Sequence, residues 1–301
     1  MKISVIIPTY NRKDALIKTL ESLSSQSYKD FEVIVIDDGS ADGTGEIVKK
    51  LNLSFKIQYI FQENKGPASA RNLGIKRAKG EIIFFTGDDI ILSKDLLKEH
   101  IKTYQTDSKK LAVLGYTQWA PNIKMTPFRK YIADYHFAYP SIDNKQDVNW
   151  GCFYTSNISI QRRFLEEVGL FDEEFPYAAY EDTELAYRLS QQGMRMVFNK
   201  KAIAYHNHLI DFKSYQKTMF NKGKAAVILV KKVPSLKRKA SYKETKNSLK
   251  LFFKRFIFNN FIISILVEMI SFLDKLFLPF PKIIYIKIMD FYRVQGIKKA
   301  Q

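Results

Sequence analysis

The chain has 301 residues, of which 46% are hydrophobic and 26% charged, so it has enough apolar material for one large domain or two ordinary ones, and its composition is not that of a disordered chain. Residues 1–210 carry 28 Lys or Arg against 26 Asp or Glu, whereas residues 211–301 carry 20 against 5, which places nearly all of the net charge of +17 in the last third. The single cysteine, Cys152, excludes an internal disulfide framework and a multi-cysteine zinc site, and it favours a reducing compartment.

The first 85 residues alternate between short apolar runs with the length of buried strands and segments whose apolar residues recur at helical spacing. Such alternation predicts an α/β fold with a mostly parallel sheet flanked by helices. The first run is too short for a signal-peptide core, so we expect this domain to stay in the cytoplasm. The predicted strands are 4–8, 32–37, 56–61 and 82–85, and the predicted helices are 14–25, 43–51 and 68–78.

Residues 107–160 are more irregular, with aromatic and polar residues mixed. Regular patterns return beyond residue 160, where a predicted helix over 183–192 precedes Gly193, a residue type that commonly follows a helix end. Further strands are predicted at 112–116, 153–160, 194–198 and 202–205, and a further helix at 162–168.

Polar clusters follow three of the predicted strands, at 9–12, 37–40 and 87–89. Ligands of open parallel sheets bind beyond the carboxyl ends of the strands, so we expect the three clusters to converge on one rim. Four aspartates crowded there would repel one another unless a cation is present. A Mg²⁺ or Mn²⁺ ion bound to a nucleotide diphosphate would supply the positive charge, while one aspartate of each pair accepts hydrogen bonds from base or ribose.

Five motifs, in order along the chain, resemble those of the family 2 glycosyltransferases, whose catalytic domain has the Rossmann-like α/β architecture known as the GT-A fold. The resemblance covers about residues 2–208 and implies a catalytic domain at 1–210. Residues 211–301 lie beyond it, and their composition predicts a helical, membrane-associating region. The motifs are VIIPTYNR at 5–12, VIDDGS at 35–40, GPASARNLG at 66–74, FFTGDD at 84–89 and EDTEL at 181–185.

The resemblance implies roles for individual residues. Asp182 would be the catalytic base, which takes a proton from an acceptor hydroxyl as that oxygen attacks the anomeric carbon. Because the base lies on the face of the sugar opposite the leaving diphosphate, the configuration of the product would invert. Thr9 and Asp38 would contact the nucleotide base. The residues implied in nucleotide-sugar binding are Pro8, Thr9, Tyr10, Arg12, Asp37, Asp38, Arg71, Thr86 and Gly87.

Metal binding is implied for Asp88, with Asp89 and His206 as further ligands. Thr86 stands where the family usually has the first Asp of its Asp-x-Asp motif. A hydroxyl can hydrogen-bond a ribose but supplies no charge, so the main metal ligand is either Asp88 or Asp89. His206 follows a strand end at which the family often places a histidine near the metal. The alternatives are a surface histidine at that position, or His208 in the same role.

Residues predicted on the acceptor side are Trp150, Asn157 and Glu181, with Trp150 stacking on a sugar ring or, alternatively, packing in the core. The acidic start of the 183–192 helix also has an alternative explanation, because carboxylates in a first turn complement the helix dipole. Arg71 would either neutralise phosphate charge or cap the preceding loop.

The tail combines basic residues over 211–255 with a strongly apolar but interrupted segment over 256–280. Basic helices with apolar faces lie on anionic membrane surfaces, so we predict peripheral association with the inner face of the cell membrane, through an interfacial or re-entrant helix rather than a crossing. The alternatives are a helical pair packed on the catalytic domain and a homodimer interface. Nucleic acid is not the predicted partner, because bulky Phe, Ile and Leu side chains suit lipid better.

The sequence therefore predicts an inverting glycosyltransferase that uses a nucleotide-diphosphate sugar, with UDP-sugar favoured, and a lipid-linked saccharide or surface polysaccharide as acceptor. One alternative is transfer to polyprenyl phosphate, for which Arg162 and Arg163 are the candidate phosphate-binding pair. Nucleotidyl transfer is disfavoured, because no Gly-rich basic loop follows the first strand. A non-catalytic membrane adaptor on the same scaffold is the alternative outside enzymes, and Thr86 is the feature that favours it.

Overall fold

The computed structural model describes residues 1–104, 110–136, 139, 142, 145–238, 240 and 260–301. The chain forms two compact units, each described here by itself. The first unit comprises Met1–Ile123 and Phe137–His208, and the second comprises Lys124–His136 and Leu209–Gln301. The sequence did not suggest that a segment from the middle of the chain belongs with the C-terminal helices.

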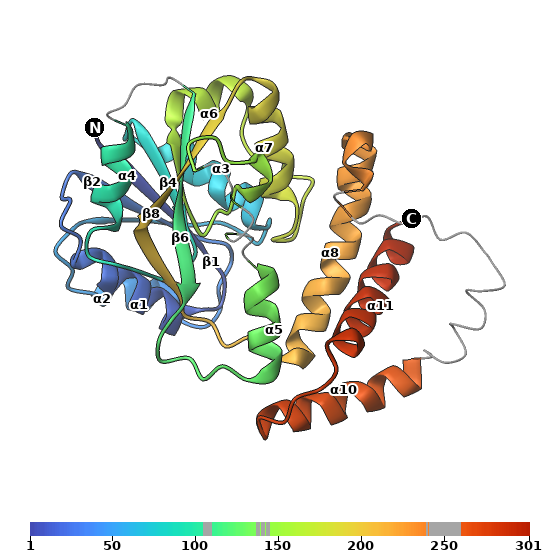
Figure 1. Cartoon of the computed structure of the whole chain (residues 1–301). Coiled ribbons are helices and arrows are strands. Elements are labelled where there is room, and N and C mark those ends of the chain that lie inside the picture. The colour runs from blue at the N-terminus through green and yellow to red at the C-terminus, as the bar shows by residue number, and fades with distance from the viewer. Residues whose placement is uncertain (105–109, 137–138, 140–141, 143–144, 239, 241–259) are drawn as a thin grey trace. The chain divides into compact units, whose positions relative to one another are not determined.

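The first unit is built on an eight-stranded sheet with strand order β3-β2-β1-β4-β7-β6-β8-β5 (Figure 1). Strands β1 to β4 are mutually parallel where they pair, β7 runs antiparallel to both of its neighbours, and β5 runs antiparallel to β8. The strands are β1 Ile3–Thr9, β2 Phe31–Asp37, β3 Ile57–Phe61, β4 Ile82–Thr86, β5 Ile90–Leu92, β6 Leu111–Trp119, β7 Asn157–Gln161 and β8 Arg195–His206.

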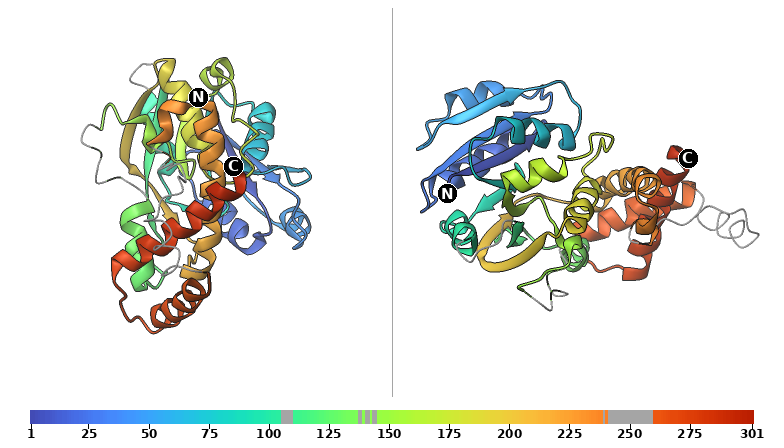
Figure 2. Two further views of the ribbon diagram at one scale, coloured as in Figure 1. Left: turned by 90° about the vertical axis from the view of Figure 1, so that its right-hand side faces the viewer. Right: turned by 90° about the horizontal axis from the view of Figure 1, so that it is seen from above.

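Helices cover both faces of this sheet, which explains why its central strands are apolar at nearly every position (Figure 2). Alternate residues of β1 point to opposite faces: Val5 belongs to one hydrophobic cluster and Ile6 to the other. Helices α1, α2 and α4 pack on the face of Val5, and α3, α6 and α7 pack on the face of Ile6. The helices are α1 Lys13–Ser24, α2 Thr44–Lys50, α3 Pro67–Arg77, α4 Leu96–Tyr104, α6 Arg162–Val168 and α7 Glu181–Gln191.

These elements confirm the predicted strands and helices of the first 85 residues to within a few residues, and two later predictions needed correction. The strands predicted at 194–198 and 202–205 form the single strand β8, because an irregularity in its pairing with β6 lets the ladder continue past Asn199 to Ile203. The strand predicted at 153–160 starts only at Asn157, because a 3-10 turn at Trp150–Cys152 precedes it.

The second unit is helical, with α5 Pro127–His136, α8 Phe212–Lys232, α10 Asn260–Lys275 and α11 Lys282–Ala300, and a short 3-10 turn at Pro234–Lys237. Helices α8 and α11 approach closely because glycines face each other: a Cβ atom on Gly296 would lie 1.9 Å from the carbonyl oxygen of Phe220. Asp274, buried near the end of α10, accepts hydrogen bonds from the Thr126 hydroxyl and from the Phe128 backbone N–H at the start of α5.

None of the helices among the described residues combines the length and the apolar character needed to cross a bilayer. The predicted basic segment 211–255 and apolar segment 256–280 are covered only in part, because residues 239 and 241–259 lie outside the described residues.

Candidate active site

The carboxyl ends of β1, β2 and β4 bring the predicted polar clusters to one edge of the sheet. Thr9, Asp37 and Thr86 are the last residues of these strands, and Asp88 and Asp89 follow β4 after a single glycine. Because β1 pairs in parallel with both β2 and β4, the three strand ends lie at the same edge. This edge is where ligands of open α/β sheets bind.

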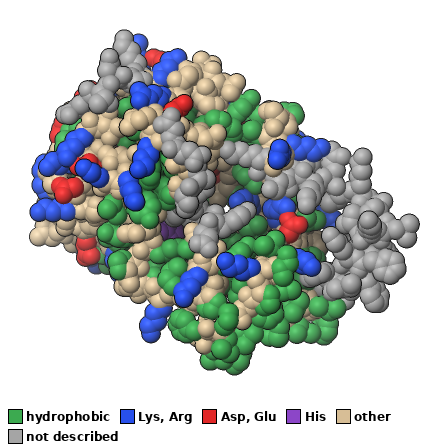
Figure 3. Space-filling view, in the orientation of Figure 1, with side chains coloured by type: hydrophobic (Ala, Val, Ile, Leu, Met, Phe, Trp, Pro, Cys, Tyr) green, Lys and Arg blue, Asp and Glu red, His purple; other side chains and the backbone are tan. Residues whose placement is uncertain are grey.

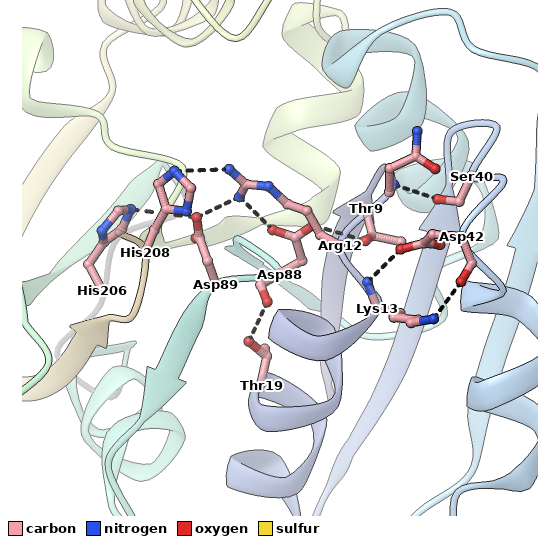
Figure 4. A network of polar contacts seen from close by, with 11 residues as sticks. Thr9, Arg12, Lys13, Thr19, Ser40, Asp42, Asp88, Asp89, His206 and His208 are labelled. Atoms are coloured by element: carbon pink, nitrogen blue, oxygen red, sulfur yellow. Dashed lines mark hydrogen bonds and ion pairs between the residues drawn. The ribbon is translucent and has the colours of Figure 1, made fainter. Parts of the chain in front are cut away.

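A guanidinium group bridges the two adjacent aspartates (Figure 4). Arg12 Nη1 lies 3.1 Å from Asp88 Oδ1 and 2.7 Å from Asp89 Oδ2, and Nη2 of the same side chain lies 3.4 Å from His208 Nε2. The Thr9 hydroxyl donates to the second oxygen of Asp88 at 2.9 Å. Residues from the first loop, the loop after β4 and the end of β8 therefore meet at one point.

Local structure holds the two aspartates in place. The Thr19 hydroxyl on α1 donates to the Asp88 carbonyl at 2.8 Å, and the Asn207 N–H donates to the Asp89 carbonyl at 2.7 Å. A Cβ atom on Gly87 would lie 2.8 Å from Asp89 Oδ1, so the glycine makes room for that carboxylate. The backbone of this loop is thus fixed from both sides.

Both aspartates are buried, but their pKa values shift in opposite directions. Burial and the neighbouring Asp89 charge raise the pKa of Asp88 to about 6, against the opposing effect of Arg12. Burial acts in the same direction on Asp89, but His206 and Arg12 outweigh it and lower the pKa of Asp89. Even with the guanidinium in place, Asp88 is short of compensating positive charge.

His206, at the end of β8, lies beside this pair. Its Nε2 atom is 3.7 Å from Asp89 Oδ2, and its ring makes an edge contact with Trp119, with 5.0 Å between ring centroids. Burial lowers the pKa of His206, and the attraction of Asp89 opposes that change only in part. A neutral imidazole is the form that binds metal ions.

The donor set at this edge fits Mg²⁺ or Mn²⁺. Among the residues that the structure describes, no three His, Cys, Asp or Glu side chains are already grouped as a metal centre. Metal sites that also use substrate phosphates need only one or two protein carboxylates, however. Oxygens of Asp88 and Asp89 converge on a single cationic nitrogen of Arg12, which shows that the two carboxylates can share one positive centre. His206 could add an imidazole nitrogen.

Asp37 anchors the loop that follows β2. One of its carboxylate oxygens accepts from the Ser40 N–H at 2.8 Å, and the other accepts from the Tyr59 hydroxyl at 2.5 Å. Burial and this hydrogen bond raise the pKa of Tyr59, so the phenol remains a donor. Asp37 therefore shapes the edge of the site with both of its oxygens.

Asp38 anchors a second loop, the one between β3 and α3. It accepts hydrogen bonds from the Gln62 side chain and from the backbone N–H groups of Lys65 and Gly66, at 2.7 to 2.9 Å. Gly66 has a φ of +91°, and a Cβ atom there would lie 2.9 Å from the Pro176 carbonyl, so this position requires glycine. The resemblance implies a base contact for Asp38, and the structure places its carboxylate in loop contacts at the same edge.

The loop after β1 presents an aromatic ring to solvent. Tyr10 is 50% exposed, next to the buried Thr9, and is thus open to stacking on a planar ligand. Asn11, in the left-handed conformation with φ of 52°, ties this loop to the one after β2 through Ser40 and Ala41. Pro8, in contrast, is part of β1 and lies opposite Ile36 in the sheet.

A buried ion pair precedes the predicted catalytic base. Arg71 Nη1 donates to Glu181 Oε1 at 2.9 Å, and the guanidinium lies over the Phe171 ring. Burial and the adjacent Asp182 raise the pKa of Glu181 to about 7, against the opposing effect of Arg71. Asp182 is half-buried in the first turn of α7, where one of its oxygens accepts from the Thr183 N–H at 2.7 Å.

The structure thus places the predicted residues in two groups. Thr9, Arg12, Asp88, Asp89 and His206 meet at the sheet edge, and Arg71, Glu181 and Asp182 meet at the start of α7.

Two residues predicted on the acceptor side, Asn157 and Trp150, differ in their burial. Asn157 is fully buried in β7, where its side chain contacts His100 and donates to the carbonyls of Tyr116 and Ala202. It therefore lies in the core of the sheet and is not presented to an acceptor. Trp150 is half-buried and makes an edge contact with Tyr187 on α7, with 5.6 Å between ring centroids.

Sequence reasoning missed two contributors to the site. Thr19 holds the Asp88 backbone from a helix position that looks like ordinary amphipathic sequence. Trp119 supports the His206 ring from the end of β6, and the sequence carries no signal for that contact. The sequence offers His208 as the alternative to His206 near the metal, and the structure places it beside Arg12.

Comparison with known proteins identifies a family. The profile of Glycosyl transferase family 2 matches residues 4–169, which is more than half of the chain. Glycosyltransferase YfnE of Bacillus subtilis is 29% identical over 253 residues, covering 68% of this chain and 64% of that protein. Chondroitin synthase of Escherichia coli is 26% identical over 270 residues, covering 79% of this chain and 39% of that protein. The chain therefore spans less than two thirds of the length of these relatives.

Solved structures support the fold. A mannosyltransferase from Pyrobaculum calidifontis, in complex with GDP-Man and Mn²⁺, has a TM-score of 0.66 at 19% identity, covering 99% of this chain and 86% of that one. TarS 1-349 of S. aureus, in complex with UDP-GlcNAc, has a TM-score of 0.55 at 20% identity, covering 100% of this chain and 93% of that one. At these identities the likeness shows a common glycosyltransferase fold.

Proposed function

Because the chain belongs to glycosyl transferase family 2, we propose that it transfers a sugar from a nucleotide-diphosphate sugar to a saccharide acceptor, with inversion at the anomeric carbon. The observation that carries the proposal is the convergence of Asp88 and Asp89 on Arg12 at the carboxyl edge of the sheet, where the Thr9 hydroxyl also donates to Asp88. A site with paired carboxylates and one partly exposed cationic side chain suits a ligand that brings both a diphosphate and a divalent cation.

The residues around the edge have distinct parts in donor binding. Asp37 and Asp38 hold the loops that border the site, and the exposed ring of Tyr10 is available to stack on a nucleotide base. Asp88 and Asp89, with His206 beside them, would hold Mg²⁺ or Mn²⁺, which neutralises charge on the diphosphate when bound. Arg12, once released from the carboxylates, would be available to pair with a phosphate, since a guanidinium suits that partner.

Asp182 is the proposed base. Its carboxylate, at the start of α7, accepts the proton of the acceptor hydroxyl while that oxygen attacks the anomeric carbon and the bond to the diphosphate breaks. The neighbouring Glu181 is buried and paired with Arg71, so it positions the start of the helix. Asp182 is then the carboxylate of this motif that is proposed to take the proton.

UDP-sugar remains the favoured donor in this proposal. One solved neighbour binds UDP-GlcNAc and the other binds GDP-Man, so the nucleotide of the donor is the first property to measure. The proposed acceptor is a lipid-linked saccharide or surface polysaccharide at the inner face of the cell membrane. Transfer to polyprenyl phosphate stays the alternative, and its candidate phosphate-binding residues, Arg162 and Arg163, form surface ion pairs with Glu166 and Glu167.

The experiment is a donor screen. Purified protein with Mn²⁺ is incubated with UDP-, GDP-, dTDP- and CDP-sugars, with and without a lipid-linked saccharide, and release of nucleoside diphosphate is measured. We expect release with one nucleotide, stimulated by the acceptor, and at least a hundredfold less with Asp182→Asn. The matched control is Glu21→Gln, which removes an exposed carboxylate on α1. Absence of release with every donor would favour the non-catalytic adaptor instead.

A further inference from the structure

Helix α10 is apolar on two opposite sides. One side packs within the second unit through Ile263, Val267 and Ile270, which are 3% exposed or less. The opposite side is open to solvent. Its large exposed side chains are Phe261 (73%), Ile265 (53%), Met269 (40%) and Phe272 (62%). Since they recur three or four residues apart, they form one stripe along the helix.

The loop that follows α10 extends this stripe. Leu276, Phe277 and Leu278 are each about half exposed, and Pro279 and Pro281 restrict the backbone behind them. Phe277 adopts φ of 59°, in the left-handed region that a bulky side chain rarely occupies. Backbone hydrogen bonds from the Phe277 N–H to the Asp274 carbonyl and from the Leu278 N–H to the Leu273 carbonyl close the end of α10, so this turn fixes Phe277 with half of its side chain exposed. The exposed stripe of α10 and residues 276–278 are called the α10 surface below.

Most of the exposed large hydrophobic side chains among the described residues belong to this segment or to the start of α11, where Ile283 and Ile286 are 54% and 47% exposed. Figure 3 shows hydrophobic side chains gathered over α10 and the loop, with basic side chains beside them. Contiguous exposed apolar patches of this kind mark interaction sites.

The charges around the α10 surface are positive. Lys275 and Lys282 are exposed and stand at the two ends of the apolar loop. The two acidic residues of α10 are both occupied: Glu268 pairs with Lys213, and Asp274 is buried against Thr126 and the start of α5. The surface therefore offers apolar side chains framed by lysines, without a compensating acidic row.

We propose that the α10 surface docks on an anionic lipid bilayer, with the 276–278 loop inserted at the level of the headgroups and Lys275 and Lys282 on lipid phosphates. Amphipathic segments of this composition bind at the boundary between headgroups and acyl chains. Lipid phosphates are the partner that the two exposed lysines at the end of the stripe fit, and a second copy of the chain is the other occupant that the test distinguishes. The proposal does not depend on the donor or on the chemistry at the sheet edge.

The test is sedimentation of the full chain with vesicles of phosphatidylcholine alone or of phosphatidylcholine with one quarter phosphatidylglycerol. We expect binding to the anionic vesicles to be at least tenfold tighter, and to weaken as salt is added. The double variant Phe272→Ser/Phe277→Asn should reduce binding to both vesicle types, and asparagine tolerates the left-handed backbone at 277. Lys275→Glu/Lys282→Glu should weaken binding to the anionic vesicles by about fivefold or more per lysine, and should leave binding to the neutral vesicles unchanged.

The matched control is Phe61→Ser, which removes an equally exposed phenylalanine from the first unit and should bind as the wild type does. Circular dichroism of each variant confirms that it is folded. Vesicle binding that the apolar double variant leaves unchanged would overturn the proposal. So would a concentration-dependent dimer that the same substitutions abolish while vesicle binding persists, because it would assign the surface to a second copy.

Discussion

In the proposed metal site, Arg12 would compete with the metal ion for the carboxylates of Asp88 and Asp89. In the structure its guanidinium occupies the point on which both carboxylates converge, so a divalent cation can bind there only after the side chain has moved away. Arg12→Ala removes this competitor and leaves the two carboxylates in place. We predict that the variant binds Mn²⁺ more tightly than the wild type does when no nucleotide is present.

The magnitude follows from the two contacts, at 3.1 Å and 2.7 Å. Hydrogen bonds to charged groups contribute about 1.5–3 kcal/mol each when sheltered. The Arg12 side chain is 38% exposed, so water screens both contacts and about 2 kcal/mol is a reasonable total for the pair. This free energy corresponds to about thirtyfold in the dissociation constant for Mn²⁺.

The assay is a titration of Mn²⁺ followed by electron paramagnetic resonance, in which only the free ion gives the sharp signal. It is run at pH 8, because the pKa of Asp88 is raised to about 6 and protons would otherwise compete. Arg163→Ala, which removes a 91% exposed arginine, is the control and should leave Mn²⁺ binding unchanged. Unchanged or weaker binding in Arg12→Ala would refute the competition.

Three further predictions concern the proposed catalytic base Asp182, the adjacent Glu181 and the helical second unit. Asp182→Asn should lower kcat by roughly 10²- to 10⁴-fold and leave nucleotide affinity within twofold, and retained turnover would remove Asp182 from the mechanism. Glu181 has a folded-state pKa of about 7 against an ordinary 4.5, so its ionisation disfavours the fold. The free energy of unfolding of the wild type should therefore fall relative to that of Glu181→Gln as the pH rises from 4.5 through 7. The fall should reach up to about 3 kcal/mol and is measured by urea unfolding at each pH. A constant difference across that range would contradict the burial argument. Gly296→Ala should destabilise the second unit by roughly 1–3 kcal/mol, because the added carbon would meet the Phe220 carbonyl at 1.9 Å, whereas the neighbouring Gln295→Ala should have little effect.

The sheet and its flanking helices were predictable from the sequence because burial on both faces leaves a strong local signal. Strands such as β1 and β4 are almost uninterrupted apolar runs, and the helices between them place apolar residues at helical spacing. The order of polar clusters after the strands was enough to predict that Thr9, Asp37 and Asp88 would meet at one edge.

Other features depend on contacts between distant residues and leave no periodic pattern. Nothing local indicates that Arg12 turns toward Asp89, 77 positions away, or that Asp38 holds the loop before α3. The prediction for Asn157 failed for the same reason. A polar side chain in an apolar strand is compatible both with a ligand contact and with a buried hydrogen bond, here to His100. Only the three-dimensional arrangement separates these alternatives.

The measurement that tests the central claim most directly is thermal unfolding of the wild type and of Asp88→Asn, with UDP- and GDP-sugars in the presence of Mn²⁺ or a chelator. A nucleotide–metal site at the carboxyl edge predicts that one donor raises the wild-type Tm only with Mn²⁺, since ligand at 100 times its dissociation constant adds about 2.7 kcal/mol of stability. The same addition should leave the Tm of Asp88→Asn unchanged. An equal shift in Asp88→Asn, or no shift of the wild type with either nucleotide, would contradict the claim.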